Sequence, residues 1–148
     1  MTQAAWEELL SLFDENERRI LKLERGEPVA KATFWRDSAH GTLGHLTACQ
    51  SAWLPLLKML DQGLVKGSVA IRPDPLYTKL GFGREDWDVI LKQFKKERAE
   101  WRRILKRIDV TAEITTPVRT HTAQTLTKRL VSHEKRHLDD LAQNSKSR

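Results

Sequence analysis

The chain has 148 residues and a formal net charge of +6, from 26 Lys and Arg against 20 Asp and Glu. This length predicts a single domain over residues 1–148, and the single cysteine excludes both a disulfide framework and an all-cysteine zinc site. No apolar run approaches the roughly 18 residues of a membrane span and the N-terminus has no signal-peptide pattern, so we expect a cytoplasmic protein with no membrane partner.

The first predicted element is a helix with Thr2 as its N-cap and a stop at Gly26 and Pro28. A second helix is predicted from an N-cap at Asp37 or Ser38 to Gly63. Apolar residues recur at three- and four-residue steps in both, which is the helical period. Pro55 lies inside the second helix, where we expect a kink or local distortion.

A long crossover rather than a helix is predicted for residues 63–83, because this segment is rich in helix breakers. They include Gly63, Gly67, Pro73, Pro75 and Gly81. The crossover is the best candidate for a lid over a site, with Arg72, Tyr77 and Lys79 as candidate substrate contacts.

The third predicted helix runs from Trp87 to Ile108 and holds much of the positive charge, since residues 84–148 contain 16 basic and 10 acidic side chains. Such a segment could bind nucleic acid or another anionic surface. We favour an ordinary solvated helix surface and expect no nucleic-acid partner, because the basic residues alternate with Glu97 and Glu100. They are Lys92, Lys95, Lys96, Arg98, Arg102, Arg103, Lys106 and Arg107.

The last predicted helix begins near Thr122 and carries apolar residues to Leu141, before a polar tail from Gln143 to Arg148. Residues 110–121 are β-prone but too few to build more than a small extended patch. Four long helices without a substantial strand predict an all-α four-helix bundle with long crossover loops.

Two histidines occupy core positions of the last helix, where Leu126, Leu130, His133, His137 and Leu141 step by three or four residues. The i, i+4 spacing presents two imidazoles on one face, a usual arrangement for binding one metal ion. His45 points inward, or nearly so, from the second helix. Three buried imidazoles could each bond a backbone carbonyl, but a shared divalent cation explains them together, so we predict a metal site at His45, His133 and His137.

The other polar residues near these histidines are expected to have lesser roles. His40 and His121 are predicted to be exposed, and Cys49, one turn from His45, to be a small core residue rather than a fourth ligand. Asp140 could accept a hydrogen bond from a ligand imidazole or lie at a solvated helix end.

Residues 133–137 read His-Glu-Lys-Arg-His, which matches the H-E-x-x-H pattern of zinc peptidases. In that hypothesis Glu134 is the general base. No third ligand follows within the last 11 residues and no sheet is predicted beside a substrate cleft, so a peptidase is disfavoured. Glu134 follows His133 by about 100° around the helix, so we expect it at the rim or surface.

The chain resembles the DinB-like family of bacterial metal-binding four-helix bundles, which includes the YfiT-type proteins. The resemblance rests on TLGHLTACQSAWL at 42–54, on Thr125-Leu126, Leu130, His133 and His137-Leu138, and on Trp35 ahead of the second helix. It implies that His45, His133 and His137 bind a divalent metal, zinc or nickel. It also implies a homodimer.

Relatives in this family include thiol-dependent S-transferases and a mycothiol-dependent maleylpyruvate isomerase. The resemblance therefore implies a metal-dependent enzyme acting on a small thiol or electrophile. The three-histidine set equally allows hydrolysis, because zinc can lower the pKa of a bound water from 15.7 to about 7. The alternative is a non-enzymatic metal-binding or interaction module on the same bundle.

Overall fold

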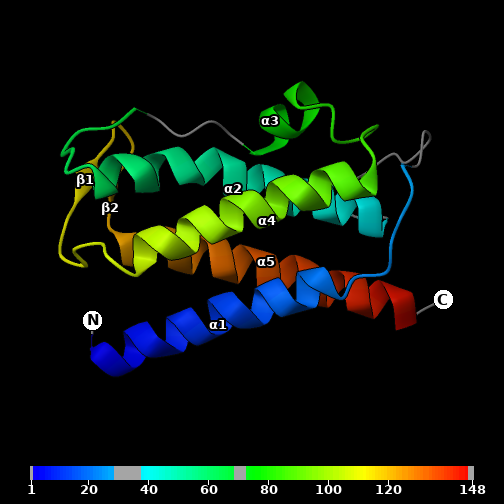
Figure 1. Cartoon of the computed structure of the whole chain (residues 1–148), viewed down its shortest axis with the longest axis horizontal. Helices are drawn as coiled ribbons and strands as arrows, with labels where there is room; N and C mark the ends of the chain where they lie inside the picture. The colour runs from blue at the N-terminus through cyan, green and yellow to red at the C-terminus, as the bar shows by residue number, and fades with distance from the viewer. Residues whose placement is uncertain (1, 29–37, 69–72, 147–148) are drawn as a thin grey trace.

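The computed structural model describes residues 2–28, 38–68 and 73–146, and within these ranges it is predominantly helical. Four long helices lie side by side in Figure 1: α1 (Gln3–Leu21), α2 (Ala39–Asp61), α4 (Trp87–Leu105) and α5 (Ala123–Lys146). A short helix, α3 (Pro73–Lys79), and two short antiparallel strands, β1 (Ile114–Thr115) and β2 (Thr120–His121), complete the described elements. The helical fold class and the small extended patch are therefore confirmed.

Side-chain caps explain where the first two helices begin. The Thr2 hydroxyl accepts a hydrogen bond from the Ala5 amide at 3.1 Å, and the Ser38 hydroxyl accepts one from the Gly41 amide at 2.9 Å. Gly63, just beyond α2, has a φ of 81°, a conformation that favours glycine and ends a helix. Asp37, the other predicted cap of α2, lies outside the described residues.

The structure corrects two of the predicted helix ends and adds one helix. The first helix ends at Leu21, before Gly26, and the last continues through the polar tail to Lys146, because no Gly or Pro follows Leu141 to stop it. The segment 63–83 contains α3, although we predicted no helix there. Pro73 and Pro75 fall in the first turn of α3, where the amide that proline lacks has no helical partner in any case.

Helix α2 is the central element of the core, since it packs against α3, α4 and α5 and also contacts β1. Pro55 is exposed and does not interrupt the helix. Because neighbours cover α2 on several sides, polar residues along its length are buried together with the apolar ones. This packing positions the candidate site.

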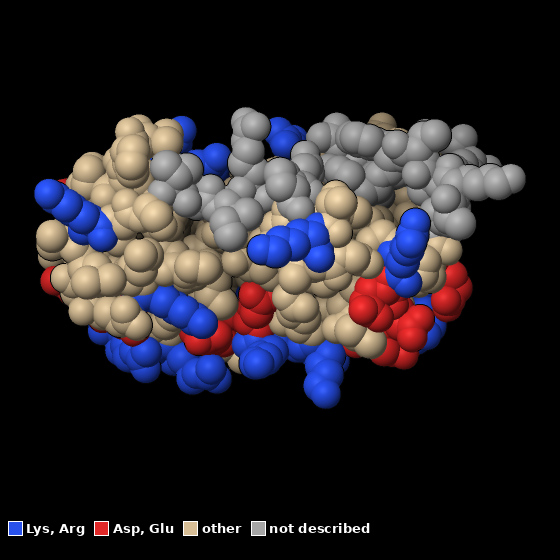
Figure 2. Space-filling view, turned by 90° about the horizontal axis from the view of Figure 1, so that it is seen from above, with Lys and Arg blue, Asp and Glu red and all other residues tan. Residues whose placement is uncertain are grey.

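Most basic residues of α4 lie at the surface, as predicted. On the face shown in Figure 2, Lys and Arg side chains are spread over the length of the molecule, with Asp and Glu between them. Arg102 bonds both Asp14 and Glu17 of α1, and Lys58 pairs with Glu100 at 2.9 Å. Arg98 is the exception, because its side chain is 0% exposed. None of the described helices has the length and apolar character needed to cross a membrane.

Candidate metal centre

The three predicted ligands come together between α2 and α5. Helix α5 supplies His133 and His137 from successive turns of one face, and α2 supplies His45 from the opposing helix. The Nε2 atom of His133 lies 3.0 Å from Nε2 of His45 and 2.8 Å from Nε2 of His137. Centroids of the three rings are 4.4 to 5.2 Å apart. One nitrogen from each ring is therefore directed into a common space.

Cys49 adds a sulfur to this group. Its Sγ atom lies 3.5 Å from Nε2 of His45 and 3.6 Å from Nε2 of His133, and the residue is fully buried. His45, Cys49 and His133 each place one donor atom within 4.8 Å of the others, which makes them a group that could hold a metal ion. Cys49 is a buried core residue, as predicted, and its contacts with the two imidazoles add to that prediction. The i, i+4 spacing from His45 to Cys49 was the available signal, and it matches that of His133 and His137.

The cluster is buried on one side and accessible on the other. His45 and His137 are 4% and 3% exposed, whereas His133 is partly exposed. The Trp53 ring packs edge-on against His133, with ring centroids 5.8 Å apart. His133 is therefore the most exposed of the three imidazoles.

Glu134 is fully buried, so its predicted position at the rim is wrong. Its two carboxylate oxygens accept hydrogen bonds from Nη2 of Arg98 at 2.7 and 2.8 Å. Asn16 Nδ2 donates to the Val131 carbonyl at 2.9 Å and to Glu134 at 3.3 Å. Burial raises the pKa of Glu134, while Arg98 and Asn16 oppose that shift.

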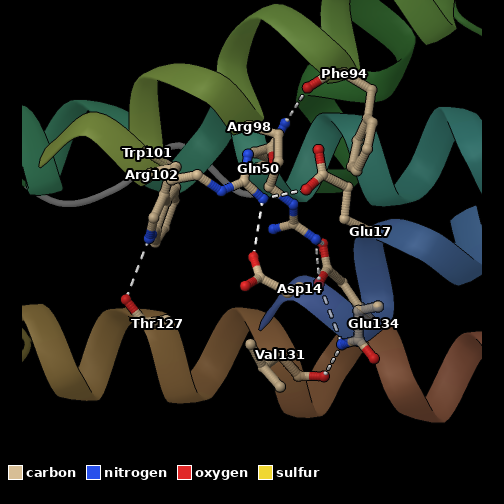
Figure 3. Close-up of polar contacts among 11 residues, drawn as sticks. Asp14, Glu17, Gln50, Phe94, Arg98, Trp101, Arg102, Thr127, Val131 and Glu134 are labelled. Atoms are coloured by element: carbon tan, nitrogen blue, oxygen red, sulfur yellow. Dashed lines mark hydrogen bonds and ion pairs between the residues drawn. The ribbon is translucent and has the colours of Figure 1, made fainter. Parts of the chain in front are cut away.

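The buried position of Glu134 follows from the neighbours of α5. One face of this helix packs on α2 and carries the histidines, while another packs on α1. A residue 100° from His133 therefore points into the interior rather than toward solvent. Figure 3 shows the polar contacts around Glu134 and Arg98. It also shows the nearby hydrogen bond from the Trp101 indole N–H to the Thr127 hydroxyl, which is 3.1 Å long.

The remaining histidines are also buried, which corrects a second prediction. His40, 2% exposed, donates from Nε2 to the Glu85 carbonyl at 2.6 Å. His121, 8% exposed, lies in β2 opposite Ile114. Asp140 is exposed, which agrees with a solvated position on the helix.

Two of the candidate lid residues can be placed. Tyr77 is partly buried, with its ring 6.2 Å from that of Phe82, and Lys79 is exposed. Burial raises the pKa of Tyr77. Arg72, the third, and Trp35, which supports the family resemblance, lie outside the described residues.

Comparison with known proteins gives one match. The family model described as the DinB superfamily matches residues 1–141, nearly the whole chain. No curated protein and no solved structure matches the sequence.

Proposed function

The chain belongs to the DinB superfamily, and we propose on this basis that it binds a divalent metal ion, zinc or nickel, through His45, His133 and His137. The observation that carries the proposal is the position of His133 Nε2, 3.0 and 2.8 Å from two other imidazole nitrogens. An imidazole nitrogen has either one proton or one lone pair, so at most one of these contacts is an ordinary two-centre hydrogen bond. A cation shared by three neutral imidazoles removes this conflict.

We also take α1, α2, α4 and α5 to be the four-helix bundle of this superfamily. The packing of α2 on α4 and α5, and of α1 on α5, supports this assignment. The proposed ligands then come from two adjacent helices of the bundle. Such a centre links chain segments almost 90 residues apart.

The proposed activity is transfer or hydrolysis on a small thiol or electrophile. Three neutral histidine ligands leave a fourth position, as in catalytic zinc sites. When bound, zinc supplies a Lewis acid that lowers the pKa of a coordinated water or thiol. The chain itself orients the imidazoles from two helices, excludes water around His45 and His137, and leaves the His133 edge open to substrate.

The second candidate is a closed, non-enzymatic metal centre with Cys49 as the fourth ligand. In a tetrahedral zinc site, bonds of about 2.3 Å to sulfur and about 2.05 Å to nitrogen separate the two ligand atoms by about 3.5–3.6 Å. The distances from Cys49 Sγ to His45 and His133 agree with that separation, at 3.5 and 3.6 Å. A fourth protein ligand leaves no position for substrate, as in structural zinc sites.

The arrangement does not support the peptidase alternative. Glu134, the general base in that hypothesis, is occupied by its buried ion pair with Arg98. A base must reach a water or substrate proton, directly or through one water molecule.

Metal analysis and cobalt spectroscopy test both candidates. Protein purified without an affinity tag should contain about one zinc or nickel per chain, and substoichiometric metal with no tight binding at neutral pH would overturn the proposal. In the enzyme candidate, cobalt-substituted wild type and Cys49→Ser have the same spectrum, and a screen with several small thiols finds transfer activity. In the closed candidate, wild type has a sulfur-to-cobalt charge-transfer band that Cys49→Ser lacks.

A further inference from the structure

A pocket lined by basic residues lies next to His133 on α5, since its lining includes Arg129 and Ser132. It has a volume of about 440 Å³ and is formed by β2, the residue before it, and the first turns of α5. Its lining includes Arg119, Lys128 and Arg129, with His121, Thr125 and Ser132 as polar neighbours, and it contains no acidic residue. Within the part of the chain that the structure describes, these three cations form no ion pair.

The contrast with another surface pocket shows that this arrangement is not general. The pocket between α2 and α4, of about 460 Å³, also has three lysines, but it includes Glu97 and Glu100. Lys58 of that pocket is paired with Glu100 at 2.9 Å. Among the residues that the structure describes, no acidic side chain compensates the positive charge of the α5 pocket, whereas charge in the α2–α4 pocket is partly neutralised.

His121 experiences this positive potential from inside the pocket. Burial lowers the pKa of His121, and the charges of Arg119 and Arg129 lower it further. A neutral imidazole and the hydroxyls of Thr125 and Ser132 add neutral polar groups to the three cations. Such a combination suits an oxyanion, because charged and neutral donors can share its oxygens.

Arg129 connects the pocket to the candidate metal centre. It precedes His133 by four residues on α5, so the two lie on one face, about 6 Å apart along the helix axis. Its guanidinium carbon lies 5.2 Å from the centre of the Trp53 ring, and the same ring packs against His133. Trp53 is 6% exposed and holds both contacts in place.

We propose that this pocket is an anion-binding subsite, which holds a carboxylate or phosphate group of a small substrate while another part of the same molecule reaches the metal centre. The subsite rests on the proposed function only for that second contact. It assigns the substrate to the class of small anionic molecules whose reactive group lies about one helical turn from the charged group.

Titration of the isotope-labelled full chain, followed by amide NMR, tests the subsite. Inorganic phosphate is one probe and succinate the other, so that the preferred oxyanion is identified. Shifts should be confined to residues 119–121 and 125–132 and should saturate. Phosphate should also raise the pKa of His121, since a bound anion offsets the nearby positive charge. Absence of localised, saturable shifts with both probes would overturn the proposal.

Two matched double variants separate the subsite from general charge effects. Lys128→Gln with Arg129→Gln should raise the dissociation constant of the bound probe, phosphate or succinate, at least tenfold. Lys92→Gln with Lys96→Gln removes the same charge from α4 and should change it less than twofold. An equal loss in both variants would contradict the proposal, as would an oligonucleotide that binds with shifts across α4 and α5 alike.

The titration is carried out with chelator and again with zinc. Anion binding in chelator together with no zinc affinity would leave the subsite standing and refute the proposed metal function. Zinc binding without localised anion shifts would refute the subsite alone.

Discussion

At the scale of single residues, Arg98 and Glu134 form an ion pair in the interior of the protein. Both side chains are 0% exposed, and the guanidinium also lies over the Phe13 ring at 4.2 Å. Taking two charges out of water costs free energy that their attraction repays only in good geometry. Removal of one partner therefore leaves a buried charge without compensation.

Glu134→Gln should lower the free energy of unfolding by about 3–5 kcal/mol, the usual cost of breaking a buried ion pair. Urea unfolding in the presence of chelator measures it. The double variant Arg98→Met with Glu134→Leu should recover most of that loss, because it leaves no unpaired charge. A loss below about 1 kcal/mol in the single variant would mean that the pair is better solvated than its burial indicates.

Glu97 gives a prediction for pH. Burial raises the pKa of this carboxyl, although Ser51 Oγ donates to it at 2.6 Å. The folded chain therefore holds the proton more tightly than the unfolded chain, and stability falls as pH rises through the raised pKa. Glu97→Gln should unfold at a higher temperature than wild type at pH 7 and should lose that advantage near pH 4.

Glu8→Gln, at an exposed position of α1, is the control for Glu97, since it makes the same change in net charge. Its melting temperature should follow that of wild type from pH 4 to pH 8. If the melting temperatures of wild type and Glu97→Gln changed with pH in parallel, the titration of this carboxyl would not be linked to folding.

At the scale of elements, the close approach of α3 to α2 depends on Gly44. A Cβ atom at this position would lie 2.7 Å from Cε2 of Tyr77 and 3.3 Å from Cβ of Phe82. Glycine in the middle of a helix costs about 0.5–1 kcal/mol relative to alanine. The contact with α3 offsets this cost, and it covers α2 next to His45.

Gly44→Ala should destabilise the protein by about 1–3 kcal/mol net, because the side chains of Tyr77 and Phe82 must shift. In a Tyr77→Ala background the same substitution should be neutral or stabilising, since the closest clash is gone and the helix-propensity gain remains. Denaturant unfolding of the four proteins in this cycle measures the coupling. Equal effects in both backgrounds would show that Tyr77 does not limit the approach of α3.

At the scale of the whole molecule, the candidate metal centre joins α2 to α5. His45 lies 88 residues before His133, so a shared metal ion would close a long loop of the chain. Metal bound only by the folded state adds to its stability by mass action. Stability with and without metal therefore reports on the ligands directly.

His45→Leu should have opposite effects on the stability of the metal-free protein and on that of the zinc-bound protein. Metal-free, the variant should melt as high as wild type or higher, because leucine replaces a buried imidazole with an apolar side chain. With zinc at 100 times the wild-type dissociation constant, wild type should gain about 2.7 kcal/mol and the variant almost none. Thermal melts with chelator and with zinc measure both, and retained zinc stabilisation in the variant would remove His45 from the centre.

The four long helices, their first two caps and the juxtaposition of three histidines could be predicted from the sequence. Apolar residues at three- and four-residue steps predict an amphipathic helix from local sequence alone. Thr2 and Ser38 cap their own helices by local hydrogen bonds. The i, i+4 spacing places His133 and His137 on one face by helix geometry alone.

The burial of Glu134, Arg98, His40 and His121, and the place of Cys49 beside two imidazoles, were decided only by the tertiary structure. The period of a helix identifies one core-facing stripe, but the number of its faces that are covered depends on how many neighbours pack around it. Helix α2 is covered by α3, α4 and α5, and α5 by α1 and α2. This packing buries His40 and Cys49 on α2 and Glu134 on α5; Arg98 of α4 is buried as the partner of Glu134, and His121 lies in β2, which contacts α5. Long-range packing supplies these partners, which local sequence cannot specify.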